Sequence, residues 1–305
     1  MSRGFHINKK DLTAENIIFT TFNTLFMCFL IVVMLYPFIN TLAISFNDGI
    51  DTVRGGIYLW PRMFSLQNYR VVFKLPTIGD ALFNSIAKTV VQVVTNLFFT
   101  GMLSYTISRK EYRLSKIITV IFVLTMYIDA GLIPNFLLIK SLGMLNTFAV
   151  YWVPNIISAF NMIVIRTYIK TIPESLIESA RIDGSSEFRI YLRIVLPLCV
   201  PVLATIALFV AVGSWNSWFD TFIYNSNPKL TVLMYEVQKL LANAQNAGAS
   251  VMGGISSADQ AAGMAVTPQS IRAATTIVAA IPILVVYPFL QRYFVTGLTI
   301  GGVKG

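Results

Sequence analysis

The sequence has little charge for its length. Asp, Glu, Lys and Arg make up 12% of its 305 residues, 55% of the residues are hydrophobic, and the mean hydropathy is +0.69. Typical soluble domains carry about 25% charged residues, so this composition excludes an ordinary soluble domain. Several apolar runs reach the roughly 20 residues that a helix needs to cross a bilayer core. Because backbone groups in lipid must be satisfied within the segment, we expect an all-α integral membrane protein.

Histidine and cysteine are nearly absent. His6 is the only histidine, and the two cysteines, Cys28 and Cys199, lie in or beside apolar runs. A metal site or a disulfide is therefore not expected. The sequence also lacks the Gly-rich loop with Lys and Ser/Thr that cradles nucleotide phosphates. We expect no catalytic site, no metal and no cofactor bound by this chain.

Acidic residues are fewer than basic ones, 14 against 23, which leaves a net charge of +9. The basic residues gather in alternate connections between apolar runs, a pattern that orients membrane spans and is not a phosphate-binding stripe. The side that holds most of them is expected to be cytoplasmic, together with both termini. No nucleic-acid partner is expected. The first apolar run is too long for a cleaved signal peptide, so we expect it to remain as a membrane helix.

Six membrane spans are predicted in a single transmembrane domain, residues 1–305. After an N-terminal tail of residues 1–16, the spans are expected at about 17–39, 82–107, 117–140, 148–170, 198–224 and 273–294. The remaining segments are an elbow at 171–197, an outer loop at 225–272 and a C-terminal tail at 295–305.

The polar stretch 171–197, called the elbow below, is predicted to form two short helices broken at a glycine. Thr171 is placed to cap the first helix, and the charge of Glu174 suits its first turn. Gly184 can take the left-handed conformation that ends a helix, and Ser185 can cap the next one. A helical elbow held outside the membrane is typical of a docking surface for a soluble partner. The alternative is an ordinary loop helix.

The elbow also carries a spaced motif. Glu178-Ser179-Ala180 is followed by three residues, Gly184, nine residues and Ile194-Val195-Leu196-Pro197. This motif resembles the EAA signature of the membrane subunits of binding-protein-dependent ABC importers, with Ser179 where the signature has Ala. A small side chain there still lets a partner approach closely.

Two further stretches resemble carbohydrate-uptake permeases. One is Phe64-Ser65-Leu66-Gln67-Asn68-Tyr69, and the other is the C-terminal stretch 291–305, which is similar to that of the maltose-type permease. The finer likeness is to a branch near the lipoprotein-associated permeases of Gram-positive bacteria, which take up polysaccharide fragments.

The resemblance implies the type I ABC importer permease fold, with six transmembrane helices and a cytoplasmic coupling elbow between spans four and five. It implies a pore-forming, non-enzymatic subunit in the bacterial cell membrane that passes a sugar or oligosaccharide. The implied partners are membrane lipid, a second homologous permease in a heterodimer, two ATPase subunits that bind ATP and Mg, and an extracellular lipid-anchored or periplasmic solute-binding protein.

The resemblance also assigns residues to the ATPase contact. Glu178 and Asp183 act either as acceptors for ATPase arginines or as internal caps. The elbow residues expected in coupling are Glu178, Ser179, Ala180, Asp183, Gly184, Ile194, Leu196 and Pro197. The C-terminal residues expected at the ATPase interface are Gly302, Lys304 and Gly305.

Polar and aromatic residues in the predicted spans are candidates for the substrate path. A carboxylate at bilayer depth is costly, so Asp129 either accepts a sugar hydroxyl or bonds a neighbouring helix. Aromatic rings beside amides and carboxylates suit sugars, although an interfacial aromatic belt or helix packing gives the same pattern. The other candidates, from spans two and five, are Asn84, Trp215, Asn216, Phe219 and Asp220.

The rival hypothesis is a self-sufficient secondary transporter or channel for a small polar solute. Such a protein is expected to show inverted repeats, broken helices and buried ion ligands. The sequence shows no repeat and one candidate buried acid. Purification of the chain with an ATPase and a second permease distinguishes the two hypotheses.

Overall fold

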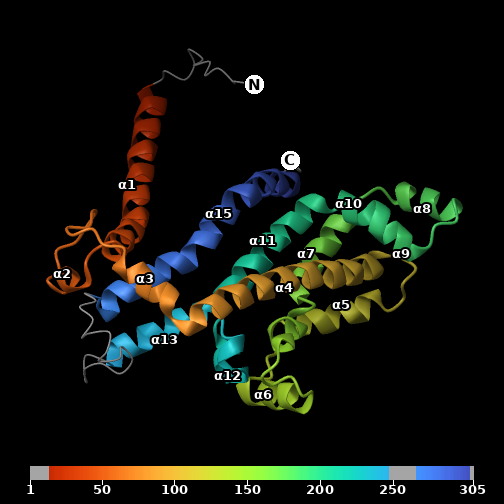
Figure 1. The fold of residues 1–305 in the computed structure, drawn as a ribbon. Helices are drawn as coiled ribbons and strands as arrows, with labels where there is room; N and C mark the ends of the chain where they lie inside the picture. Colours follow the sequence, from red (N-terminus) through yellow and green to blue (C-terminus); the bar gives the residue numbers. More distant parts are fainter. Residues whose placement is uncertain (1–13, 247–265, 303–305) are drawn as a thin grey trace. The chain divides into compact units, whose positions relative to one another are not determined.

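The computed structural model describes residues 14–246 and 266–302, and every regular element within them is a helix (Figure 1). An isolated antiparallel bridge joins Asn47 and Phe64. The chain divides into two compact units, one of residues 1–72 and 252–277 and the other of residues 73–251 and 278–305. The all-α expectation is confirmed for the described residues.

The first unit contains α1 (Ala14–Ser45), α2 (Gly49–Val53) and the start of α3 (Gln67–Lys74). The 32 residues of α1 extend about 48 Å, which exceeds the roughly 30 Å of a bilayer core. The polar loop after α1 is fastened back to its end. Asn68 donates to the carbonyls of Ser45 and Asn47, at 2.9 and 2.7 Å, and the Tyr69 hydroxyl lies 2.7 Å from that of Ser45. The stretch 64–69 therefore holds this loop in place.

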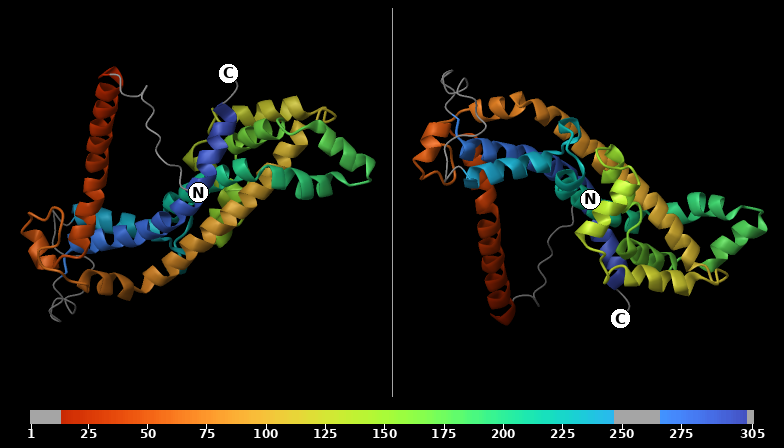
Figure 2. Two further views of the ribbon diagram at one scale, coloured as in Figure 1. Left: turned by 90° about the horizontal axis from the view of Figure 1, so that it is seen from above. Right: turned by 90° about the horizontal axis from the view of Figure 1, so that it is seen from below.

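The second unit is built around α4 (Pro76–Ser108), which packs against α7 (Ala159–Ile169) and α11 (Val200–Asn216) (Figure 1; Figure 2). α8 (Glu174–Ile182) and α9 (Glu187–Ile190) lie at one end of α4 in all three views. The other elements that begin in this unit are α5 (Ser115–Leu124), α6 (Leu132–Ser141), η2 (Phe148–Tyr151), η3 (Val153–Asn155), the π-helical turn η4 (Tyr191–Val195), α10 (Leu196–Leu198), α12 (Phe219–Tyr224), η5 (Pro228–Leu230) and α13 (Leu233–Asn246). The last helix, α15 (Pro268–Gly302), runs through both units.

Three helical segments among the described residues are each long and apolar enough to cross a membrane: Glu15–Ser45, Pro76–Ser108 and Pro268–Val285. Two bent pairs pass the same test. Phe148–Asn155 meets α7 at a bend of 47°, and Glu187–Leu198 meets α11 at a bend of 82°. Counting each pair as one span gives up to five spans, so six spans remain a prediction.

The predicted span at about 117–140 is two shorter helices, α5 and α6, separated by residues 125–131. Asp129 Oδ1 accepts a hydrogen bond from the Gly131 amide at 3.1 Å, and Gly131 has a φ of +84°. Both features favour a turn over a continuous helix. The predicted span at about 198–224 likewise divides into α11 and α12, because Ser217 between them is extended.

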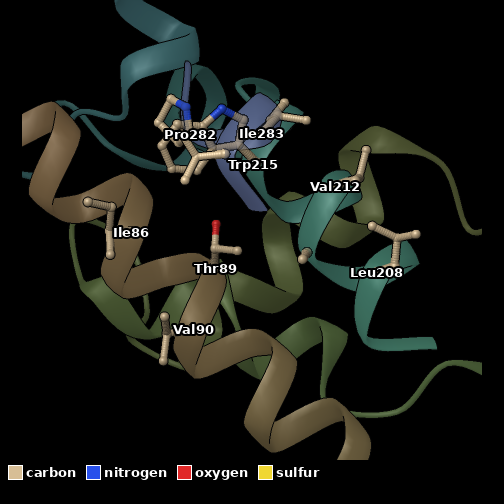
Figure 3. A pocket seen from close by; sticks show the side chains of 10 residues that line it. Ile86, Thr89, Val90, Leu208, Val212, Trp215, Pro282 and Ile283 are labelled. Atoms are coloured by element: carbon tan, nitrogen blue, oxygen red, sulfur yellow. The ribbon is translucent and has the colours of Figure 1, made fainter. Parts of the chain in front are cut away.

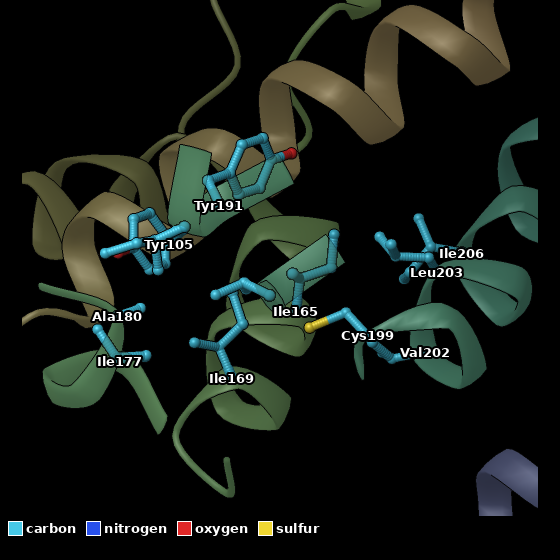
Figure 4. Close-up of a cluster of buried hydrophobic side chains, with 12 residues drawn as sticks. Tyr105, Ile165, Ile169, Ile177, Ala180, Tyr191, Cys199, Val202, Leu203 and Ile206 are labelled. Atoms are coloured by element: carbon cyan, nitrogen blue, oxygen red, sulfur yellow. The ribbon is translucent and has the colours of Figure 1, made fainter. Parts of the chain in front are cut away.

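The largest cluster of buried apolar side chains in the second unit lies where the elbow meets α4, α7 and α11 (Figure 4). Five of its members lie in the elbow, and Cys199, Val202 and Leu203 follow shortly after it. The cluster comprises Tyr105, Ile165, Ile169, Ile177, Ala180, Ile190, Tyr191, Val195, Cys199, Val202, Leu203 and Ile206. The elbow is therefore anchored in the core and is not a free surface loop.

Candidate functional site

The turn between the two elbow helices closes at Gly184. This residue has a φ of +78°, its amide donates to the Arg181 carbonyl, and the Ser185 amide donates to the Ala180 carbonyl, both at 3.0 Å. These two bonds form a Schellman motif, which requires a left-handed residue at the position of Gly184. The predicted conformation of this glycine is confirmed.

The predicted caps at the helix starts are wrong. The residue that precedes α8 is Pro173, and the Thr171 hydroxyl bonds back to the Tyr168 carbonyl at 2.7 Å. Thr171 thus bonds to the last turn of α7 and does not cap α8. The residue that precedes α9 is Ser186, whose side chain accepts no capping bond, so Ser185 does not cap that helix.

The two faces of α8 differ in burial. Ile177 and Ala180 face the core, whereas Glu178, Ser179 and Asp183 are exposed. Ala180, expected at the ATPase contact, packs inside the chain. Ile182 is 86% exposed, which is unusual for a large apolar side chain on a polar helix.

The second half of the elbow presents two more exposed apolar side chains, Phe188 at 55% and Leu192 at 38%. On α9 (Glu187–Ile190), Ile190 faces the core and Phe188 does not. Ile194 and Leu196 are partly buried against the core, and Pro197 is exposed. Ile182 and Phe188 are therefore the most exposed apolar side chains of the elbow, and sequence reasoning missed both.

Ion pairs tie the elbow to the turn after α4. Arg181 donates to Glu187 at 2.6 Å and to Glu111 at 2.5 Å, and the Tyr105 hydroxyl donates to the other oxygen of Glu187 at 2.5 Å. The hydrogen bond from Arg181 is the main cause that lowers the pKa of both carboxyls below the ordinary value of 4.5. The same pairs raise the pKa of Arg181. The network keeps both glutamates charged near neutral pH.

Close packing joins the elbow to α4 as well. Tyr191 donates its hydroxyl to the Phe98 carbonyl at 2.9 Å, one helical turn from Gly101. A Cβ at Gly101 would lie 2.7 Å from the Tyr191 hydroxyl oxygen. A glycine is therefore required for the two segments to approach this closely.

A polar cavity of about 530 Å³ lies among α4, the start of α7, and the segments around α11 and α12. Amides, hydroxyls and one carboxylate dominate its wall. The residues that line it are Gln92, Asn96, Asn155, Ile157, Ser158, Asn161, Phe209, Val210, Gly213, Ser214, Ser217 and Asp220. The Ser214 hydroxyl is buried and has no hydrogen-bond partner among the described residues, so the wall offers an unused polar group.

A buried lysine lies behind this wall. Lys88 is 1% exposed, its Nζ donates to the Ser217 carbonyl at 2.9 Å, and it lies 5.1 Å from the centroid of the Tyr151 ring. Ser217 in turn donates its hydroxyl to Asp220 at 2.6 Å. Sequence reasoning missed Lys88, although a lysine inside an apolar run is itself a signal.

Trp215 belongs to a different, apolar cavity of about 390 Å³ (Figure 3). Its walls come from α4, α11 and the part of α15 around Pro282, and Trp215 Nε1 donates to the Ala279 carbonyl at 3.0 Å. This tryptophan therefore packs α11 against α15.

The remaining path candidates lie outside the polar cavity, except Asp220. Asn84 donates to the carbonyls of Lys229 and Thr231, Asn216 is exposed and donates to the Val212 carbonyl, Phe219 is exposed, and Asp129 is exposed in the break before α6. Gln92 and Asn96, one turn apart on α4, were overlooked. Gly302 is the last residue of α15, and Lys304 and Gly305 lie outside the described residues.

The described residues form long apolar helices with a polar cavity between them and an anchored polar elbow, which is the architecture of a membrane transport protein. Residues 12–300 match the family described as the binding-protein-dependent transport system inner membrane component. The chain belongs to this family, which confirms the family predicted from the elbow motif. It is the permease subunit of a binding-protein-dependent ABC importer.

Two relatives and one solved structure match nearly the whole chain. The polygalacturonan/rhamnogalacturonan transport system permease protein YtcP of Bacillus subtilis is 35% identical over 92% of this chain and 96% of its own length. The protein LplC of Bacillus subtilis is 35% identical over 94% and 95%. A chain of a bacterial ABC transporter involved in the import of the acidic polysaccharide alginate superposes with a TM-score of 0.85 at 27% identity, over 92% of this chain and 98% of that one.

Proposed function

We propose that this permease passes an oligosaccharide, delivered by an extracellular solute-binding protein, through the polar cavity of its second unit. The main observation that supports this proposal is the polar lining of the cavity. Its amides and hydroxyls are donors and acceptors that pair with sugar hydroxyls, and the unpartnered Ser214 hydroxyl offers one more. Of the relatives named above, one is named for polygalacturonan and rhamnogalacturonan, and a solved neighbour imports alginate.

The wall of the cavity bears on the class of sugar. Asp220 is the one charged side chain among the described residues that line it, and no Lys or Arg lines it to neutralise a sugar carboxylate. The cavity therefore recognises the hydroxyl groups of the sugar. The binding protein selects between acidic and neutral oligosaccharides.

The elbow is proposed as the cytoplasmic docking site of an ATPase subunit. Ile182 and Phe188 provide apolar anchors, and Glu178, Ser179 and Asp183 form a polar rim, an arrangement typical of protein interfaces. Two such ATPases, each binding ATP and Mg, and a second permease complete the proposed importer, with six spans in this chain and both termini in the cytoplasm. The partner permease is proposed to be a different chain.

Reconstitution tests the function. The chain is co-expressed with a candidate partner permease and ATPase, and the complex is placed in proteoliposomes. ATP-dependent uptake is then measured with its binding protein and a panel of galacturonate and alginate oligomers. We expect uptake of at least one oligomer that requires both ATP and the binding protein. Uptake driven by an ion gradient without an ATPase would favour the secondary transporter, and a complex with two copies of this chain would contradict the heterodimer.

Substitution of Asp220 and Gln92 tests the path. We expect Asp220→Asn and Gln92→Ala each to lower oligosaccharide uptake about tenfold, because each removes a hydrogen bond in a desolvated site. ATP hydrolysis without the binding protein should stay unchanged. The matched control is Asn216→Ala, which removes an exposed amide outside the cavity. Equal uptake by all three variants would place the path elsewhere.

A further inference from the structure

A second cavity, of about 620 Å³, lies beside the start of the elbow, within the second unit. Its wall comes from the end of α4, the turn before α5, the first turns of α5, the end of α7 and the first residues of the elbow. Its charged lining is mainly basic: Arg109, Lys110, Arg113, Lys116, Arg166 and Lys170. Glu174 is the single carboxylate among the described residues that line it.

Little of this positive charge is neutralised within the chain. Lys110 pairs with Glu174 at 2.6 Å, which uses the one carboxylate of the wall. Nε of Arg166 is buried and lacks a hydrogen-bond partner in the described part of the chain. The lining cations that form no ion pair within residues 14–246 and 266–302 include Arg113, Lys116 and Lys170. Like charges that converge on one cavity attract an anion with several acceptor oxygens, such as a phosphate.

The surface next to the cavity is apolar. Val120 of α5 lines the cavity itself, and Ile117, Ile121 and Leu124 continue along the same helix as exposed side chains. None of the residues of α5 is buried in this chain. A phosphate site that opens onto an exposed apolar helix fits an amphiphile better than a soluble phosphate, because the helix also covers an acyl chain.

We infer that this cavity binds the headgroup of an anionic phospholipid, with the phosphate among the basic side chains and an acyl chain along α5. The inference rests on the proposed topology, which places the elbow and this cavity at the cytoplasmic face. Basic pockets between helices on that side are suited to phosphate headgroups. A volume of about 620 Å³ lies within the ~300–1,000 Å³ range of small-ligand sites.

Native mass spectrometry of the purified importer tests the site. The complex is placed in nanodiscs of equal phosphatidylglycerol and phosphatidylcholine, and the lipid retained after release is identified. We expect the native chain to retain phosphatidylglycerol selectively. Arg113→Gln with Lys116→Gln should lower this retention roughly tenfold or more, because each charge near a headgroup contributes about 1 kcal/mol.

The matched control removes the same charge elsewhere. Arg70→Gln with Lys74→Gln alters two exposed basic side chains outside the cavity and should retain phosphatidylglycerol as the native chain does. Equal retention by both double variants, or equal retention of both lipids by the native chain, would overturn the inference. Displacement of phosphatidylglycerol by orthophosphate alone would assign the cavity to a soluble phosphate. The measured quantity is bound lipid, which does not depend on sugar uptake. The result therefore tests this cavity even if the proposed sugar transport is wrong.

Discussion

Gly101 of α4 and Tyr191 of the elbow form a close contact. The hydroxyl of Tyr191 reaches past Gly101 to the Phe98 carbonyl, and a Cβ at position 101 would lie 2.7 Å from the hydroxyl oxygen but 3.7 Å from the ring carbon that bears it. The hydroxyl therefore causes the overlap, and the ring does not. This separation makes the contact testable with paired substitutions.

We expect Gly101→Ala to destabilise the chain by about 1–3 kcal/mol, the usual cost of overpacking a core. Tyr191→Phe should relieve part of that loss when it is combined with Gly101→Ala, because it removes the overlapping oxygen. Thermal unfolding in detergent measures all three variants. Gly79→Ala, on the same helix with open space around its Cβ, is the control. Purely additive losses in the double variant would contradict the close approach.

Some single residues could be predicted from sequence and others could not. The left-handed conformation of Gly184 was predictable because a local pattern, a glycine after an amphipathic turn, determines it. Asp220 was predicted for the path and lines the polar cavity, whereas Asn84 and Trp215 use their polar groups to fasten helices. Whether a buried amide faces a cavity or a carbonyl depends on tertiary packing, which a local pattern does not encode.

At the scale of elements, the elbow is held by one connected network of charges. Glu187 accepts from both Arg181 and Tyr105, so it links α9 to α8 and to α4, whereas Glu111 reaches Arg181 from the turn after α4. The existence of two elbow helices was predictable from the polar stretch and its glycine. The network was not, because Glu111 and Tyr105 lie more than 60 residues before the elbow's Arg181.

We expect Glu187→Gln to loosen the elbow by on the order of 1 kcal/mol, because it removes the charge that faces Arg181 across a partly exposed pair. Faster amide exchange over 174–190 would show this loosening. Glu111→Gln is the control, since it leaves the contacts between Glu187, Arg181 and Tyr105 in place. An equal effect of both variants would contradict the central role of Glu187.

The same network predicts a pH dependence. The pKa values of Glu111 and Glu187 are lowered in the folded chain, mainly by hydrogen bonds from Arg181. Their stabilisation is therefore complete above the ordinary carboxyl pKa and is lost as the pH falls through the lowered folded values. Exchange over 174–190, corrected for intrinsic rates, should accelerate in that acidic range. An unchanged response in Glu187→Gln would contradict this assignment.

At the scale of the whole molecule, the class of protein was predictable from composition and the elbow motif, and the family match confirms it. The division of a predicted span into α5 and α6 was not, because the break depends on Asp129 and Gly131 acting together in a turn. Mean hydropathy over a window as long as a span includes both residues and therefore does not show the break. In the sequence, the basic residues after α4 are interpreted as a topology signal. That these residues meet Arg166 and Lys170 around one cavity depends on the tertiary fold.

We propose that the elbow transmits the ATPase cycle to the membrane path. Gly184 and Gly143 allow a matched test, because both are left-handed glycines in Schellman turns, with φ of +78° and +66°, and neither has an atom within 4 Å of an added Cβ. Alanine at either position therefore costs about 1 kcal/mol of backbone strain, and proline also removes the amide donor. Only Gly184 lies in the elbow.

The measurement is ATP hydrolysis by the reconstituted importer, stimulated by its binding protein loaded with the transported sugar. We predict that Gly184→Pro abolishes the stimulation and Gly184→Ala reduces it, while Gly143→Pro and Gly143→Ala retain it at similar expression and thermal stability. Full stimulation in Gly184→Pro, or the same loss in both pairs of variants, would contradict the elbow as the coupling element.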